Sequence, residues 1–180
     1  MNRNKRMVIC AVVTILLVLI DQFTKKLAYM NLKDSAPFVI LNNILEFYYL
    51  PNGNTGAAFG MLQGHQLLFS IIAIVVCAGL VYIIYRMPCN KKYNLLIALF
   101  VMIIAGGIGN MIDRVKQNYV IDFIYFEIID FPIFNVADIY VSVATVLLVI
   151  SVLFIYKDSD IKEIEDSVLG FNRNKKNKSI

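Results

Sequence analysis

Four apolar segments, each about as long as a bilayer core is thick, dominate the chain. They cover residues 7–27, 66–85, 93–112 and 136–156. A helix needs roughly 20 apolar residues to cross a hydrocarbon core of about 30 Å, and lipid offers no partner to unpaired peptide groups. With 59% hydrophobic residues and a mean hydropathy of +0.68, the chain is far more apolar than a globular protein. The sequence therefore predicts an all-α membrane protein with four transmembrane helices.

The first apolar segment also resembles a secretory signal, because Arg3, Lys5 and Arg6 precede it. No small-residue cleavage site follows Ile20, however, and the polar stretch 21–26 comes instead. We interpret the segment as a retained signal-anchor helix. The chain is then expected to form one four-helix transmembrane domain over residues 1–156, followed by a polar, basic tail over residues 157–180.

Lysine and arginine are distributed unevenly between the loops. The N-terminus, the second loop and the C-terminal tail together hold twelve of them, and the other two loops hold five. Since cytoplasmic flanks carry the excess of basic residues, both termini are expected in the cytoplasm. The formal net charge of +4 is then a signal of topology and does not argue for nucleic acid.

The two loops on the opposite side are unusually apolar. Residues 38–50 and 119–126 have the β-branched and aromatic content of strands. Tyrosine and phenylalanine at this level also fit the aromatic belt of a membrane interface. We therefore expect a small extracytoplasmic β-sheet and an outer loop at the membrane surface.

Metal-binding patterns are not evident in the sequence. Cys10, Cys77 and Cys89 are widely separated, and His65 is the single histidine. No disulfide framework or ligand spacing follows from this arrangement, and a metal site would have to be built from carboxylates alone. We expect neither a metal ion nor an organic cofactor.

Polar clusters occur where two of the apolar segments end. Residues 109–114 close the third segment, residues 134–138 open the fourth, and the short stretch 120–123 lies between them. A carboxylate at mid-membrane costs on the order of 2.5 to 3.5 kcal/mol, and less near the interface. Three aspartates gathered there, one in each stretch, therefore indicate acid–base chemistry.

The three aspartates, Asp113, Asp122 and Asp138, differ in their sequence neighbours. Asp113 is followed by Arg114, which should keep it ionised and structural. Asp122 has no basic neighbour, and Asp138 lies one helical turn after Asn135. Two such carboxyls brought together share one proton, which suits a base that activates water and an acid that protonates a carbonyl.

Asparagine accompanies two of these aspartates, and small residues form two further stretches. Asn110 precedes Asp113 by three residues, as Asn135 precedes Asp138, so on a helix each pair shares a face. Residues 54–60 are interpreted as a loop that returns into the second helix. Residues 105–109 carry small residues at helical spacing, which indicates close helix packing rather than a phosphate loop.

Five ordered blocks resemble the lipoprotein signal peptidases (signal peptidase II), over residues 7–156. The blocks are residues 21–25, 54–59, 106–114, 120–123 and 134–138. The resemblance implies an aspartic endopeptidase of the bacterial plasma membrane. It would cut the signal peptide of a prolipoprotein before the diacylglyceryl-modified cysteine, near the outer leaflet. Membrane lipids would be its other partners, and a monomer would suffice.

The resemblance also implies roles for individual residues. Asp122 and Asp138 would be the catalytic dyad. Supporting or substrate-binding roles would fall to Asp21, Asn54, Asn110, Asp113, Arg114 and Asn135. The chain departs from the family at Asn118 and at Ala144, where glycine is expected. Since asparagine also tolerates a left-handed turn, the turn at Asn118 should survive.

Two other classes of protein also place acids in membranes. Presenilin-type and prepilin peptidases carry Gly-x-Gly-Asp, whereas Gly107-Ile108-Gly109 is followed here by Asn110. A proton-coupled transporter should show mid-membrane carboxylates or inverted repeats, and neither is seen.

Overall fold

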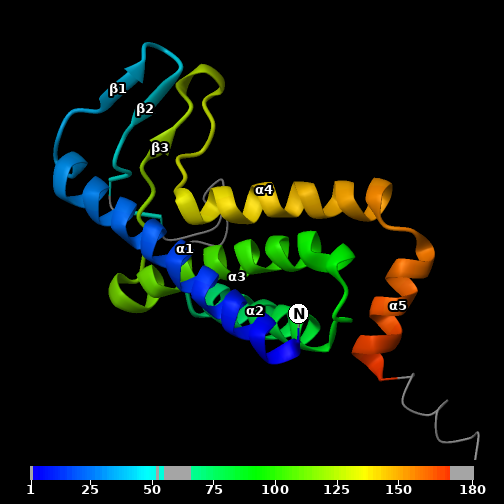
Figure 1. Cartoon of the computed structure of the whole chain (residues 1–180). Helices are drawn as coiled ribbons and strands as arrows, with labels where there is room; N and C mark the ends of the chain where they lie inside the picture. The colour runs from blue at the N-terminus through cyan, green and yellow to red at the C-terminus, as the bar shows by residue number, and fades with distance from the viewer. Residues whose placement is uncertain (1, 52, 55–65, 171–180) are drawn as a thin grey trace, which may run out of the picture.

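Four long helices form the body of the protein, as the computed structural model shows for residues 2–51, 53–54 and 66–170 (Figure 1). They are α1 (Arg3–Leu32), α2 (Gln66–Arg86), α3 (Asn94–Gln117) and α4 (Val136–Ile150). A short 3-10 helix (Lys91–Tyr93) leads into α3, and a π-helical turn (Ser151–Ile155) extends α4. With these extensions, all four are long and apolar enough to span a membrane, which confirms the predicted fold class.

Helix α1 is longer than the predicted span 7–27, and its first turn is anchored by Arg6. This arginine is 2% exposed, although it precedes the apolar run. Its guanidinium donates hydrogen bonds to the carbonyl oxygens of Tyr85, Met87 and Pro88, at 3.3, 2.7 and 3.1 Å. These carbonyls lie at the C-terminal end of α2, where the helix dipole favours a cation. Arg6 therefore joins α1 to α2 and is more than a signal of topology.

Helix α3 is the central helix and contacts each of the other three. Half of its apolar window is buried, against about a tenth or less for the other helices. A Cβ at Gly106 would lie 2.5 Å from the carbonyl oxygen of Ala137, and one at Gly109 would lie 2.5 Å from Oδ2 of Asp21. Both distances are too short for a side chain, so the small residues allow the close packing that the sequence predicts.

The sheet lies at one end of the helix bundle. Strands β1 (Phe38–Leu41), β2 (Leu45–Phe47) and β3 (Ile124–Tyr125) are antiparallel in the order β1-β2-β3. Both loops predicted to contain strands therefore contribute to it. In Figure 1 the sheet projects beyond the start of α4.

Beyond β2, the chain continues as an extended segment beside residues 120–123. The amide of Leu50 donates to the carbonyl of Asp122 at 3.1 Å, and Asn54 forms an antiparallel bridge with Val120. This pairing brings Asn54 next to Asp122, although they are 68 residues apart. Helix α3 ends at Asn118, which has φ of +63° and so forms the left-handed turn expected of it.

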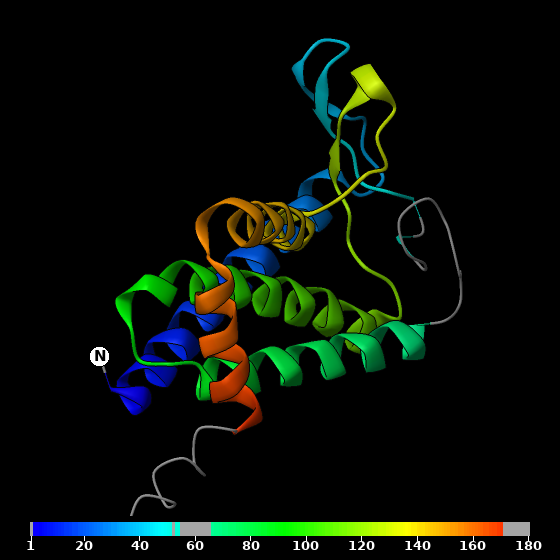
Figure 2. The same cartoon turned by 90° about the vertical axis from the view of Figure 1, so that its right-hand side faces the viewer.

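The region predicted as a polar tail begins with a further helix, α5 (Asp158–Leu169). It crosses the ends of the helices away from the sheet (Figures 1 and 2). Lys92 pairs with Asp160 and Glu163 at 2.9 and 2.7 Å, and Arg86 donates to the carbonyl of Ser167. Ile161 and Ile164, on the inner face, pack against the core. The basic residues after 170 lie outside the described part of the chain.

Candidate active site

Asp122 lies in the connection between α3 and α4 and is 1% exposed. Its Oδ2 accepts a hydrogen bond from Asn54 Nδ2 at 2.8 Å, and its Oδ1 accepts one from Asn135 Nδ2 at 2.6 Å. Burial and the nearby Asp138 carboxyl raise the pKa of this carboxyl to about 7, although the hydrogen bonds from Asn54 and Asn135 act to lower it. Asp122 can therefore hold a proton at neutral pH.

Asp138 is placed by the start of α4. Asn135 is the N-cap: its Oδ1 accepts from the Asp138 amide at 3.0 Å, and Asp138 Oδ2 accepts from the Asn135 amide at 3.1 Å. This is a capping box, which satisfies two amides at the helix start. The other oxygen of Asp138, Oδ1, accepts from Asn110 Nδ2 at 2.8 Å. The spacing of three residues thus fixes the carboxyl against its own helix.

Two asparagines connect the two carboxyls. Asn135 Nδ2 reaches both Asp122 Oδ1 and Asn110 Oδ1, the latter at 3.1 Å, and Asn110 Nδ2 reaches Asp138. Each of the four carboxyl oxygens of Asp122 and Asp138 therefore accepts a donor. Because these donors come from three separate segments, the pair is held in one arrangement by the tertiary structure.

Asp113 lies beside this pair but belongs to a different set of contacts. Its carboxyl pairs with Lys25 at 3.1 Å and accepts from Gln22 and from the amide of Ile121, at 2.9 and 3.2 Å. The close ion pair of Asp113 is thus with Lys25, which the sequence did not suggest. Arg114 donates to Gln66 at 3.1 Å, and its charge acts on Asp138, Asp122 and Asp113.

Asp21, on α1, holds the start of α4. It is fully buried, and its Oδ1 accepts from the Ala137 amide at 2.9 Å. A carboxylate at this position satisfies an unpaired amide and is favoured by the helix dipole. Its Oδ2 pairs with Lys25 at 2.9 Å, which closes the link between α1, α3 and α4.

Lys25 and Gln22 are the site residues that the sequence interpretation missed. Lys25 is 1% exposed and contacts Asp21, Asp113 and Asn110. Its position four residues after Asp21 was a usable signal, since residues so spaced share a helix face. Gln22 and Lys25 both fall in the family block 21–25, but the sequence interpretation gave neither a role at the site and otherwise counted Lys25 among the loop cations that report topology.

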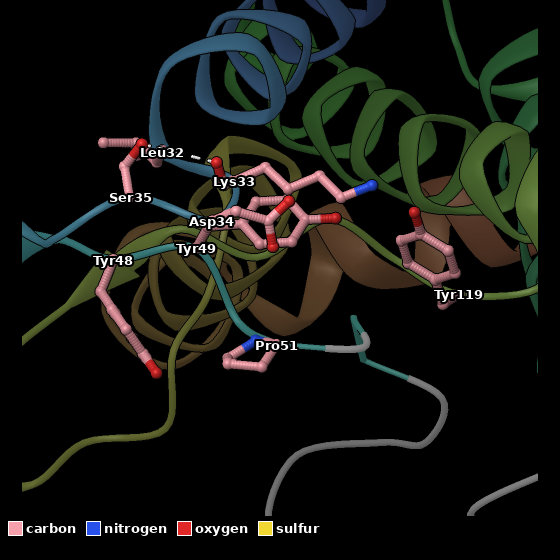
Figure 3. A pocket seen from close by; sticks show the side chains of 8 residues that line it. All are labelled: Leu32, Lys33, Asp34, Ser35, Tyr48, Tyr49, Pro51 and Tyr119. Carbon is pink, nitrogen blue, oxygen red and sulfur yellow. Dashed lines mark hydrogen bonds between the residues drawn. The ribbon is translucent and has the colours of Figure 1, made fainter.

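A cavity of about 340 Å³ lies at the C-terminal end of α1. Figure 3 shows that its walls come from the end of α1, from the segment after β2 and from the residue that follows α3's terminal turn. The lining residues are Leu32, Lys33, Asp34, Ser35, Tyr48, Tyr49, Pro51 and Tyr119. Burial raises the pKa of the Tyr49 phenol, so its hydroxyl stays protonated. The segments that carry Tyr49 and Tyr119 also carry Asn54 and Asp122.

Within residues 2–51, 53–54 and 66–170, no group of three or more His, Cys, Asp or Glu residues could hold a metal ion. The predicted loop after Asn54, from Thr55 to Gly60, and His65 lie outside the described residues.

Comparison with known proteins gives one consistent result. The family described as Signal peptidase (SPase) II matches residues 13–154. A lipoprotein signal peptidase of Streptococcus agalactiae is 40% identical over 147 residues, which is 81% of this chain and 92% of that protein. One from Caldanaerobacter subterraneus is 41% identical over 138 residues, or 76% and 90% of the two chains.

A solved structure described as a bacterial membrane enzyme superimposes with a TM-score of 0.69. It is 32% identical and covers 82% of this chain and 94% of its own. These matches leave no support for the transporter or for the Gly-x-Gly-Asp peptidases. Together with the coupled carboxyls, they show that the chain belongs to the signal peptidase II family of bacterial lipoprotein signal peptidases, which are aspartic peptidases of the membrane.

Proposed function

We propose that Asp122 and Asp138 are the catalytic pair with which this lipoprotein signal peptidase removes signal peptides from prolipoproteins. The cut falls before the diacylglyceryl-modified cysteine. The observation that carries the assignment is the hydrogen-bonded link Asp122–Asn135–Asn110–Asp138, in which the buried Asp122 carboxyl has its pKa raised to about 7.

Asp122 is the acid and Asp138 the base in this mechanism. Asp138 accepts donors in the first turn of α4, where the helix dipole favours a carboxylate. It takes a proton from water as the water oxygen bonds to the scissile carbonyl carbon, and Asp122 gives its proton to the carbonyl oxygen. In the second half the C–N bond breaks, the amine takes the proton from Asp138, and the hydroxyl proton returns to Asp122.

The remaining polar residues position this pair. Asn54, Asn110 and Asn135 orient the two carboxyls through the hydrogen bonds described above. Asp21 holds the start of α4 and Asp113 holds the 120–123 stretch, each by accepting from a backbone amide. The positive charge of Arg114 acts on Asp138 and Asp122.

The proposed topology places both termini in the cytoplasm and the catalytic pair near the outer leaflet. Arg6, Arg86 and Lys92 support it, because they gather at the end of the bundle away from the sheet. Cytoplasmic ends of transmembrane helices are enriched in such cations. A lipid-anchored substrate presents its cleavage site at the opposite surface, beside Asp122.

The cavity at the outer end of α1 is proposed to accept the polypeptide that follows the cut. Lys33 and Asp34 balance one another in charge, and the tyrosine and serine hydroxyls can both donate and accept. Such a lining suits the neutral main chain of a peptide. Its walls continue into the extended segments that pair beside Asp122, so the substrate chain has a short path from the catalytic pair.

The catalytic assignment is tested with a purified, reconstituted enzyme and a prolipoprotein substrate. Asp122→Asn and Asp138→Asn should each reduce cleavage by about 100-fold or more, because general acid–base catalysis contributes roughly 10² to 10⁴. Asp130→Asn is the control, since the Asp130 side chain is exposed and accepts a hydrogen bond from the Tyr125 hydroxyl, which an asparagine oxygen can also accept. Full cleavage by either folded catalytic variant would refute the assignment.

A further inference from the structure

Lys25 occupies an unusual position for a lysine, since it is buried at a point where three acceptors converge. Its ammonium lies 2.9 Å from Asp21 Oδ2, 3.1 Å from Asp113 Oδ2 and 2.8 Å from Asn110 Oδ1. A lysine ammonium has three donor hydrogens, and here each one has an acceptor. Two of the acceptors are on α3 and one is on α1 itself.

The contact with Asn110 determines which way that amide faces. Because Lys25 and Asn135 both donate to Asn110 Oδ1, the Nδ2 group of Asn110 is directed to Asp138. The reversed amide would place its NH₂ against an ammonium and its oxygen against a carboxyl. Lys25 thus selects the orientation in which Asn110 donates to Asp138.

We propose that Lys25 is a positioning residue for catalysis, which fixes the Asn110 amide and through it the Asp138 carboxyl. The inference rests on the proposed function, because it takes Asp138 as a member of the catalytic pair. Lys25 itself touches neither carboxyl of that pair in the hydrogen bonds described, and acts through Asn110.

Lys25 also contributes a positive charge to a region rich in carboxyls. The charged groups around it are Asp21 on its own helix, Asp113 on α3, Asp122 in the following connection and Asp138 on α4; the Arg114 charge also acts on the last three. The Lys25 charge lowers the pKa of Asp122, although less than burial and Asp138 raise it. Removing the charge should therefore move the pH–rate profile to higher pH, since Asp122 must keep its proton to act as the acid.

The test compares Lys25→Met and Lys25→Arg in the full-length, reconstituted enzyme. Lys25→Met should lower kcat by roughly 10 to 100-fold with little change in KM, because misplaced catalytic groups lose rate rather than substrate affinity. The pH–rate profile of Lys25→Met should shift to higher pH by roughly half to one pH unit. Lys25→Arg should also lose kcat, since a planar guanidinium cannot match the three acceptors, but should keep the profile near that of the native enzyme.

Two matched controls separate positioning from stability. Lys26→Met removes the next lysine, which is exposed, and should leave kcat and the profile unchanged. Arg6→Met removes another buried cation of α1, at the far end of the bundle. It should lower the unfolding temperature without altering kcat per folded enzyme or the pH profile.

If Lys25→Met does not fold, Lys25→Met combined with Asp113→Asn removes one buried carboxylate together with the cation. The proposal expects this folded double variant to retain the low kcat. A normal kcat and an unchanged profile in either folded variant would overturn the positioning role and leave Lys25 as a structural ion. If the Lys25 variants behaved in this way while Asp122→Asn and Asp138→Asn were inactive, the catalytic assignment would stand and only the role of Lys25 would fall.

Discussion

Replacement of Gly109 by alanine tests how tightly the candidate active site is built. The added Cβ would lie 2.5 Å from Asp21 Oδ2, 3.1 Å from Asp21 Cγ and 3.4 Å from Ala137 Cβ. Asp21 cannot simply move away, because it is fully buried and held by Lys25 and by the Ala137 amide. Either α3 must separate from α1 and α4, or Asp21 must leave the start of α4.

The cost can be approximated from these two alternatives. Overpacking a well-packed interior costs about 1 to 3 kcal/mol, and leaving a buried amide without its acceptor costs about 1 to 3 kcal/mol. We expect Gly109→Ala to lower the unfolding free energy by about 2 kcal/mol or more, which corresponds to a fall of about 4 to 8 °C in Tm. Cleavage should fall as well, because Asp21 binds the Ala137 amide in the first turn of α4, and that turn carries Asp138.

Other glycines supply an internal series for this experiment. A Cβ at Gly79, on α2, would meet nothing within 4 Å, and one at Gly107 would lie 3.1 Å from Cys77 Sγ. Gly79→Ala should be neutral or slightly stabilising, since alanine favours a helix over glycine by roughly 1 kcal/mol. The unfolding free energy of Gly107→Ala should lie between those of Gly79→Ala and Gly109→Ala. Thermal unfolding in detergent measures the series, and a Gly109→Ala protein as stable and active as Gly79→Ala would refute the argument.

Three further predictions concern other parts of the molecule. The pKa of Asp122 is raised in the folded state to about 7 from 3.8, so the folded protein binds this proton more tightly than the unfolded chain. The resulting stabilisation is fully present below the unfolded-state pKa and is lost as pH rises through about 7. The native protein should therefore gain more thermal stability than Asp122→Asn when pH is lowered from about 8 to about 5, and equal gains would contradict the raised pKa. Arg6→Met should lower the unfolding free energy by about 2 to 3 kcal/mol, because α2 loses a charged donor at its carbonyl end, and an unchanged Tm would show that the cap is dispensable. Ser35→Trp should fill the outer cavity and raise KM for a full-length prolipoprotein but not for a peptide that ends just after the lipid-modified cysteine, whereas equal effects on both would remove the cavity from the substrate path.

The sequence predicted those features of the protein that depend on residues close together in the chain. Hydropathy over about 20 residues identified all four helices, because the bilayer imposes that length on any spanning segment. The strand content of both outer loops was also readable, and so was the left-handed turn at Asn118. Asn135 and Asp138, three residues apart, form a capping box, and its geometry depends only on one helical turn.

Contacts between distant segments could not be read in the same way. The sequence suggested its neighbour Arg114 as the charge that keeps Asp113 ionised. The close ion pair of Asp113 is instead with Lys25, which is far away along the chain. Likewise, the role of Asp21 at the start of α4 spans 116 residues, and α5 is held by Arg86 and Lys92, which are distant in the sequence. Each of these depends on which helix faces meet.

By itself, the sequence determined the membrane class, the number of spanning helices and the aspartates worth testing. These properties follow from local apolar length, residue spacing and the family motifs. Only the tertiary structure decided that Asn54, Asn110 and Asn135 converge on Asp122 and Asp138, and that Lys25 is buried behind them. The reason is that buried polar groups must find partners, and in this protein those partners lie on other helices, brought within reach by the glycines of α3.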